Sequence, residues 1–299
     1  MKKFIKINAL ILLFFTGCET VVEIDIPVEA PSLVINSTLA VDSLIKIHIS
    51  KSKHILGSVP FDVVDGAVVT ILENETLLTT LVNSTNGWYI AADYKPKKGS
   101  TYNIKVEKEG FDTATAQVYI PLDTVKILSA KLESENTILK VNFKDDNDKT
   151  NYYEIFVTKS YYDYSYDYST SSPVLIDSTF NSFPISIESN DPSLEEYQNY
   201  GQSIFFNDAF FNGQTYTMNL DIFDYDDSQN SSPPSQSKPV YKVYINNTSK
   251  SYYLHELSTL LKKWNTDDPF AQPVTVFNNI ENGFGIFGGY NTAVYKVEK

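Results

Sequence analysis

Apolar and polar residues alternate along most of the chain after residue 30. In the segment 44–50, isoleucines take positions 45, 47 and 49, and polar residues take the positions between them. The same alternation occurs in the segments 102–107, 139–144, 216–222 and 241–245. Alternation with one polar face predicts half-buried strands of antiparallel sheets. Turn pairs such as Asp65-Gly66 and Glu109-Gly110 separate the strands, so the pattern predicts a mainly β protein built from sandwiches.

The strand pattern is interrupted near Pro121, where we expect a domain boundary. Residues 31–121 contain about seven strand candidates, the number found in one immunoglobulin-like sandwich. Residues 122–299 predict a second β-rich, sandwich-like domain that carries polar loops at 160–203 and 226–238.

One helix is predicted near the C-terminus, at 251–264. Its apolar residues recur at helical spacing from Tyr253 to Trp264, and two lysines occupy its last turn, where they suit the helix dipole. Asp267-Asp268-Pro269 ends the helix. Three short strands are expected after it, at 274–277, 284–287 and 293–298.

The first residues predict a lipid anchor. Lys2, Lys3 and Lys6 precede an apolar run at 9–15, which is too short for the roughly 20 residues that cross a bilayer. Phe15-Thr16-Gly17-Cys18 resembles a lipobox, so we expect residues 1–17 to be a lipoprotein signal peptide. Cys18 would then carry the lipid, and residues 18–30 would form a tether to the outer membrane. The acidic residues that follow Cys18 resemble a surface-export signal and favour the cell surface over the periplasmic face.

Composition excludes some classes of protein. The formal net charge is −13, and every one of the 24 basic residues is a lysine. A nucleic-acid partner is not expected, because phosphate binding needs a basic surface. The single Cys excludes a disulfide framework.

Candidate catalytic motifs are weak. Gly283-Phe284-Gly285-Ile286-Phe287-Gly288 matches a dinucleotide fingerprint, but only 11 residues follow it, and they predict a strand instead of the required helix. We interpret it as a glycine-rich final hairpin. His48, His54 and His255 have no metal-ligand spacing, and the nucleophile-elbow motif is absent. We therefore expect no enzyme activity, no cofactor and no metal.

Two polar segments keep two interpretations open. The acidic segment Asp145-Asp146-Asn147-Asp148 favours a hairpin turn between strands 137–144 and 151–158, with a calcium site as the alternative. The tyrosine-rich segment is either a recognition loop for a protein or glycan, or a hairpin whose tyrosines alternate between core and rim. Its tyrosines are Tyr161, Tyr162, Tyr164, Tyr166 and Tyr168.

Several segments resemble one family of Bacteroidota lipoproteins, the domain of unknown function 4249. The resemblance lies in Asp268–Val274 and Asn278–Tyr290, in Asn151-Tyr152-Tyr153, and in Phe206-Asn207-Asp208 with Phe211-Asn212-Gly213. Glycines for tight turns, asparagines bonded to nearby backbone and phenylalanines in the core are the favoured explanation of the C-terminal segment.

The resemblance implies an outer-membrane lipoprotein that begins with an immunoglobulin-like or carboxypeptidase-regulatory-like sandwich. Genes of this family often stand beside those of TonB-dependent transporters, and the resemblance implies no catalytic residue. The expectation is therefore a non-catalytic accessory or substrate-capture partner of such a transporter. The alternative is a stand-alone glycan-binding or adhesion lipoprotein.

Overall fold

The computed structural model describes residues 30–53, 62–82, 85–123, 125–133, 137–146, 149–223, 233–266 and 270–298. Within these residues the protein is mainly β, as the alternation predicts. From Pro31 onward the chain forms one compact unit.

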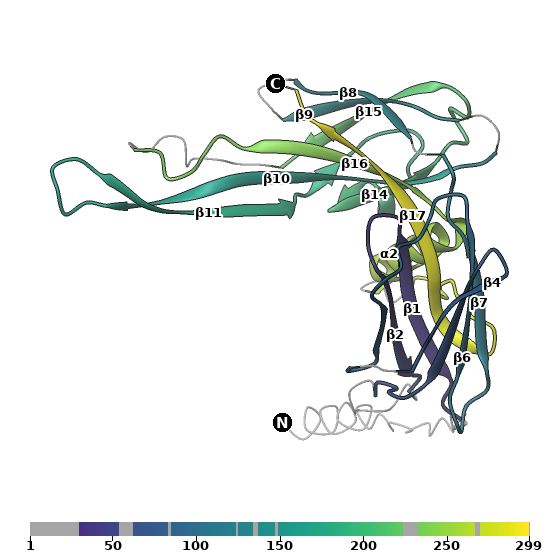
Figure 1. Cartoon of the computed structure of the whole chain (residues 1–299). Helices are drawn as coiled ribbons and strands as arrows, with labels where there is room; N and C mark the ends of the chain where they lie inside the picture. The colour runs from purple at the N-terminus through teal and green to yellow at the C-terminus, as the bar shows by residue number, and fades with distance from the viewer. Residues whose placement is uncertain are drawn as a thin grey trace, which may run out of the picture. The chain divides into compact units, whose positions relative to one another are not determined.

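The largest sheet, which we call the shared sheet, takes strands from both halves of the chain (Figure 1). Its strand order is β11-β10-β16-β17-β1-β2-β5, and β14 also pairs with β10. The strands are β1 (Leu33–Ala40), β2 (Ile45–Lys51), β5 (Trp88–Ala91), β10 (Tyr152–Asp167), β11 (Val174–Pro184), β14 (Ser203–Asn207), β16 (Val240–Thr248) and β17 (Gly283–Lys296).

Two smaller sheets complete the fold. The N-terminal sheet has the order β4 (Thr76–Leu81), β3 (Val68–Glu73), β6 (Thr101–Glu107) and β7 (Ala114–Tyr119). The C-terminal sheet has the order β13 (Tyr200–Gly201), β12 (Ile187–Glu188), β15 (Thr215–Ile222), β9 (Ile138–Lys144) and β8 (Lys126–Glu133). The helical elements among the described residues are the 3₁₀ turn η2 (Glu196–Gln198) and the helix α2 (Lys250–Asn265).

Each smaller sheet encloses a separate hydrophobic core with the shared sheet. The first core joins the isoleucines of β2 to apolar residues of β3, β6 and β7, and it also includes Ile280 and Phe287 from the end of the chain. The second core joins β9 and β15 to β10, β14 and β16. The expected boundary at Pro121 separates the two cores along the sequence, except for the residues near 280–287 that return to the first.

Strand β17 connects the two sandwiches. From Gly283 to Tyr290 it pairs in parallel with β1, and from Tyr290 to Lys296 it pairs antiparallel with β16. Because side chains alternate along a strand, Phe287, Asn291 and Ala293 share one face. Phe287 packs in the first core and Ala293 packs against the second.

Two buried asparagines hold the crossing between the cores. Asn247 and Asn291 face each other across β16 and β17. The Nδ2 of Asn291 donates to the carbonyl oxygens of Pro121 (2.5 Å) and Asp123 (3.0 Å), and the Nδ2 of Asn247 donates to the same Asp123 oxygen (2.9 Å). These bonds fix the chain where it leaves the first sandwich.

Helix α2 confirms the predicted helix at 251–264 and packs on the face of β17 opposite the cores. Its N-cap Ser249 accepts hydrogen bonds from the backbone N–H of Tyr252 (3.3 Å) and of Gly289 (3.1 Å). A Cβ at Gly288 would lie 2.8 Å from the Cβ of Tyr252, so this close approach requires glycine.

The segments 284–287 and 293–296 are strand, as predicted, but both belong to the single strand β17, so the predicted final hairpin is wrong. Within the motif that suggested a hairpin, Gly288 serves the close packing of α2 instead. The strand predicted at 274–277 is also absent from the described residues. The side chains of α2 bond this segment, since Ser258 Oγ accepts from Phe277 N–H (2.8 Å) and His255 Nδ1 lies 2.8 Å from Phe277 O.

We predict that Asn291→Ala lowers the free energy of unfolding by about 1–3 kcal/mol, because the Pro121 carbonyl loses its buried donor and the Asp123 carbonyl keeps only Asn247. Asn219→Ala, at an exposed position of β15, is the control and should stay within about 0.5 kcal/mol of the native protein. Urea denaturation measures both. Equal losses in the two variants would show that the asparagine contacts do not stabilise the fold.

Candidate functional site

The tyrosine-rich segment forms a hairpin that continues past the sandwich. Strand β10 pairs with β16 only as far as Ser160, and beyond that point its ladder continues with β11 alone. We call residues 161–181 the arm; Figure 1 shows its β10 and β11 strands running away from β9 and β15. All five predicted tyrosines lie on it, and none belongs to either core.

One face of the arm is aromatic. Alternation places Tyr162, Tyr164 and Tyr166 on the same side of β10, and the cross-strand neighbour Phe180 joins them, with its ring 5.2 Å from that of Tyr162. Tyr168 follows, 6.3 Å from the ring of Tyr166. Tyr162, Tyr168 and Phe180 are 46%, 66% and 57% exposed. We call these five residues the aromatic face.

The opposite face of the arm is acidic. It carries Asp163, Asp167 and Asp177 at the alternate positions of the two strands. Asp163 accepts hydrogen bonds from the side-chain amides of Asn181 (2.7 Å) and Gln236 (2.6 Å). The N–H of Ser169 donates to Asp167 and lowers the pKa of its carboxyl.

Tyr161 differs from the other four tyrosines because it points to the acidic face, at the base of the arm. Its ring contacts Phe183 edge to face at 6.0 Å, and the Lys159 ammonium lies 5.3 Å above it.

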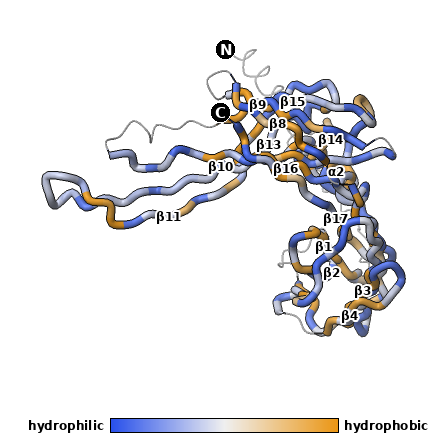
Figure 2. The backbone as a smooth tube through the Cα atoms, turned by 45° about the horizontal axis from the view of Figure 1, so that its top comes forward, coloured by the Kyte–Doolittle hydropathy of each residue, from blue (hydrophilic) through white to orange (hydrophobic). Residues whose placement is uncertain are grey.

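A third segment orders the inner edge of the arm. The N–H of Tyr164 donates to the carbonyl of Ser235 (2.7 Å), and the N–H of Ser237 donates to the carbonyl of Tyr162 (2.8 Å). Near the turn, Val174, Leu175 and Ile176 are all more than half exposed, which Figure 2 shows as a hydrophobic segment of β11.

The structure therefore shows which conformation the tyrosine-rich segment has. The segment is a hairpin, but the expected alternation of its tyrosines between core and rim is wrong, since the arm lies beyond both cores. Much of the loop expected at 160–203 is strand, because the alternating tyrosines of β10 are themselves a strand pattern and β11 pairs with them.

A second cluster gathers segments that are distant in the sequence around the buried Asp145. Its carboxylate accepts hydrogen bonds from the Tyr153 hydroxyl, from Asn151 Nδ2 (3.3 Å) and from the N–H of Gly213 (2.7 Å). The neighbouring buried carboxylate, Asp208, accepts from the N–H of Asn151 (2.8 Å). Burial raises the pKa of both Asp208 and Tyr153.

This network replaces the predicted hairpin turn at 145–148. Strands β9 and β10 belong to different sheets, so the chain crosses between sheets there and the hairpin prediction is wrong. Asn147 and Asp148 lie outside the described residues. Among the described residues, no three His, Cys, Asp or Glu side chains are placed to hold a metal ion.

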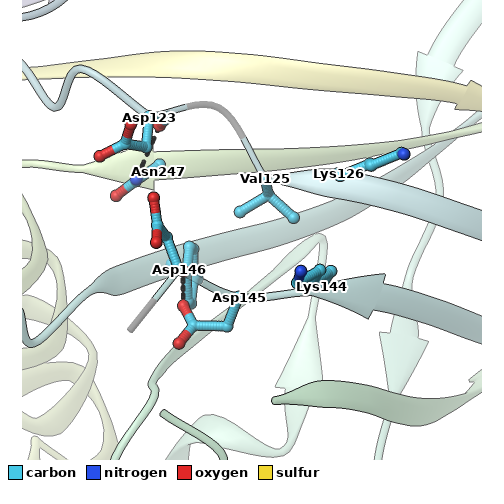
Figure 3. Close-up of a pocket in the computed structure, with 8 residues that line it drawn as sticks. Asp123, Val125, Lys126, Lys144, Asp145, Asp146 and Asn247 are labelled. Atoms are coloured by element: carbon cyan, nitrogen blue, oxygen red, sulfur yellow. Dashed lines mark hydrogen bonds between the residues drawn. The ribbon is translucent and has the colours of Figure 1, made fainter. Parts of the chain in front are cut away.

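A cavity of about 270 Å³ adjoins the network (Figure 3). Asp123 and Asp146 lie on one side of it in this view, and Lys126 and Lys144 lie on the other. The described residues that line it include no Ser, Cys or His.

The histidines that the structure describes lie apart. The ring of His48 contacts that of Trp88 at 4.9 Å, and His255 lies on α2 beside Phe277. His54 falls outside the described residues, as do Cys18 and the predicted signal peptide at 1–17. In the part of the chain that is described, no helix has the length and apolar character to cross a membrane.

The glycine-rich motif lies inside β17, and no helix follows it in the described residues. Asn279 exchanges two hydrogen bonds with the backbone of Phe287, both 2.9 Å long, and the Phe287 ring is fully buried. Gly285 has φ +110°, and a Cβ there would lie 2.1 Å from the carbonyl oxygen of Ile35. The expected backbone-bonding and core roles are confirmed for Asn279 and Phe287, whereas Phe270 and Phe284 are exposed and the glycines lie in a strand instead of tight turns.

One buried acid is not apparent from the sequence. Glu154 lies on β10 under α2, where it accepts hydrogen bonds from Asn246 Nδ2 (2.8 Å) and the Tyr252 hydroxyl (3.4 Å). Burial raises the pKa of its carboxyl, and the nearby charge of Glu256 adds to the shift.

This shift predicts a pH dependence. The folded pKa of Glu154 lies above its ordinary value of 4.5, so its stabilising contribution is full below that value and is lost as the pH rises through the folded pKa. We predict that Glu154→Gln removes part of the fall in stability between mildly acidic and neutral pH. Urea denaturation at several pH values measures it, with the exposed Glu109→Gln as control. Parallel profiles for all three proteins would contradict the prediction.

Comparison with known proteins identifies the family of the chain. No curated protein matches it. The family model described as domain of unknown function (DUF4249) matches residues 19–296, a range that contains the arm, the Asp145 network and β17. The chain therefore belongs to the DUF4249 family.

Proposed function

We propose that this protein is a lipid-anchored outer-membrane protein without catalytic activity, which serves a TonB-dependent transporter as an accessory or substrate-capture partner. The observation that carries the proposal is the arm, whose exposed aromatic face extends beyond both cores.

The arm has the properties of a binding element. Exposed aromatic groups that gather on one face mark interaction sites more often than scattered apolar residues do. Tyrosine offers a large contact area with few rotatable bonds. The backbone bonds from residues 235 and 237 hold the arm in place before any partner arrives, which reduces the entropy lost on binding.

The lipid supplies the second part of the mechanism. A diacylated Cys18 confines the protein to the membrane plane and raises its effective concentration beside a membrane-embedded partner. Weak contacts through the arm would then suffice for a lasting complex.

A glycan-binding or adhesion role is the second candidate. It is favoured by the aromatic face itself, because tyrosine rings stack on the faces of sugars, and Tyr162, Tyr168 and Phe180 are open to solvent on one side. A soluble glycan would bind the purified protein without any transporter, which separates the two functions.

We predict that Cys18 is the site of lipidation. Cells fed an alkyne fatty acid should label the native protein, and Cys18→Ser should remove the label completely, because the chain has no other cysteine. Label that persists in this variant would place the acyl group elsewhere. Immunoblotting of both proteins controls for expression.

We also predict that the tagged mature protein, extracted from outer membranes in mild detergent, brings a TonB-dependent barrel with it in near-equal amount. Tyr162→Ala with Phe180→Ala should reduce the barrel at least about tenfold, which corresponds to 1.4 kcal/mol. The control carries Tyr94→Ala and Phe284→Ala, which remove two exposed aromatic groups from the first sandwich, and should retain the barrel.

The copurification experiment distinguishes the accessory role from the glycan-binding role. If the protein comes out alone under conditions that preserve known complexes, the accessory role is wrong. A glycan screen with the same two double variants then tests the second candidate.

A further inference from the structure

The outer edge of β11 is an unprotected strand edge. β11 is the last strand of the shared sheet in the described part of the chain. It has 11 residues, its only charged residue is Asp177, and its only proline is its last residue. Natural edges are usually short or carry lysines and prolines that prevent pairing. β5 and β13 have only 4 and 2 residues, and β8 carries two lysines.

The backbone of β11 presents hydrogen-bonding groups on that edge. Tyr162 and Tyr164 direct their backbone groups toward residues 235–237, away from β11. Their cross-strand partners, Phe180 and Ser178, are therefore in non-hydrogen-bonded pairs and direct their own N–H and C=O groups outward. Ser182 has the same phase, two residues further along. The N–H of Ser178 is taken by the Asp177 side chain (2.8 Å), which leaves Phe180 and Ser182 as the outward donors of this stretch.

The two faces of the arm define what fits on this edge. A strand added beside β11 would extend both faces, because its side chains alternate in the same way. One set would lie beside the aromatic face, next to Phe180 and Leu175. The other set would lie beside the acidic face, next to Asp177.

We propose that the β11 edge binds an extended segment of a partner polypeptide in which apolar residues alternate with lysine or arginine. The main-chain bonds to Phe180 and Ser182 supply affinity, and the two faces supply specificity. This inference rests on the proposed function and specifies how the partner is held.

A second copy of the chain is disfavoured as the occupant. Antiparallel pairing of two β11 edges would put both acidic faces on one side of the joined sheet, where like charges destabilise strand pairing. Each copy also has a formal net charge of −13. A basic partner gains from the same charges.

The test uses the mature protein and two peptides of 11 residues, the length of β11. One alternates Val and Lys, and the other alternates Val and Glu. We expect saturable binding of the Val/Lys peptide by fluorescence anisotropy, at least about tenfold tighter than that of the Val/Glu peptide. Hydrogen exchange at the amides of Phe180 and Ser182 should slow when the Val/Lys peptide is bound. Asp177→Lys should reduce the preference between the peptides.

A matched pair of variants isolates the backbone edge. Ser182→Ala and Ser182→Pro both remove the hydroxyl that lies 2.9 Å from the Ser160 hydroxyl, but only the proline removes the outward N–H. Binding of the Val/Lys peptide should change less than about twofold in the alanine variant and weaken at least about fivefold in the proline variant. Circular dichroism checks that both variants keep the fold.

The outcomes separate this inference from the proposed function. No saturable peptide binding, or equal binding by both Ser182 variants, overturns strand addition, even if a barrel still copurifies with the native protein. Peptide binding with the expected variant effects supports strand addition, even if no barrel copurifies. A dimer in sedimentation experiments that Ser182→Pro converts to monomer would make a second copy the occupant and overturn the assignment to a partner.

Discussion

The pairing of β17 with two strands from opposite ends of the chain is the constraint on which the rest of the structure depends. Its first half bonds to β1 and its second half to β16, so the last described strand completes both sandwiches. The crossing at Pro121–Asp123 is then fixed by Asn291 of the same strand. Contacts between residues so far apart in sequence carry a large cost in loop-closure entropy. Because β17 pairs with strands of both sandwiches, its loss would weaken both cores.

Most individual strands follow from local alternation, whereas their connections do not. The isoleucines of β2 and the apolar residues of β9 and β15 occupy the expected faces, because burial on one side of a sheet imposes that pattern. The glycine-rich motif at 283–288 misleads, since glycine serves both turns and close packing, and only the position of Tyr252 shows that Gly288 serves packing. The acidic segment at 145–148 misled the prediction for a similar reason. A run of polar residues is typical of a turn, and only the fold shows that Asn151 and Gly213 donate hydrogen bonds to the Asp145 carboxylate.

The arm was partly visible in the sequence. The alternating tyrosines allowed a hairpin with tyrosines in core and rim, but only the register places Tyr162, Tyr164 and Tyr166 on one aromatic face and Tyr161 on the acidic side. Phe180 belongs to the aromatic face, and Leu175 lies beside it, through cross-strand pairs that no local pattern reveals. Glu154 was missed because its burial comes from α2, which lies about a hundred residues further along the chain.

The shared sheet also determines how the arm can act. The ladder from β11 through β10 and β16 to β17 is continuous, so the arm is an extension of the same hydrogen-bonded layer that closes both cores. A strand received at β11 would add to a surface that is already ordered, and little conformational entropy would be lost by the protein itself. The lipid expected at Cys18 would limit the search for that strand to the membrane plane. The lipid anchor would thus raise the rate of encounter with the partner, and the β11 edge would supply the contacts that hold the partner once it is bound.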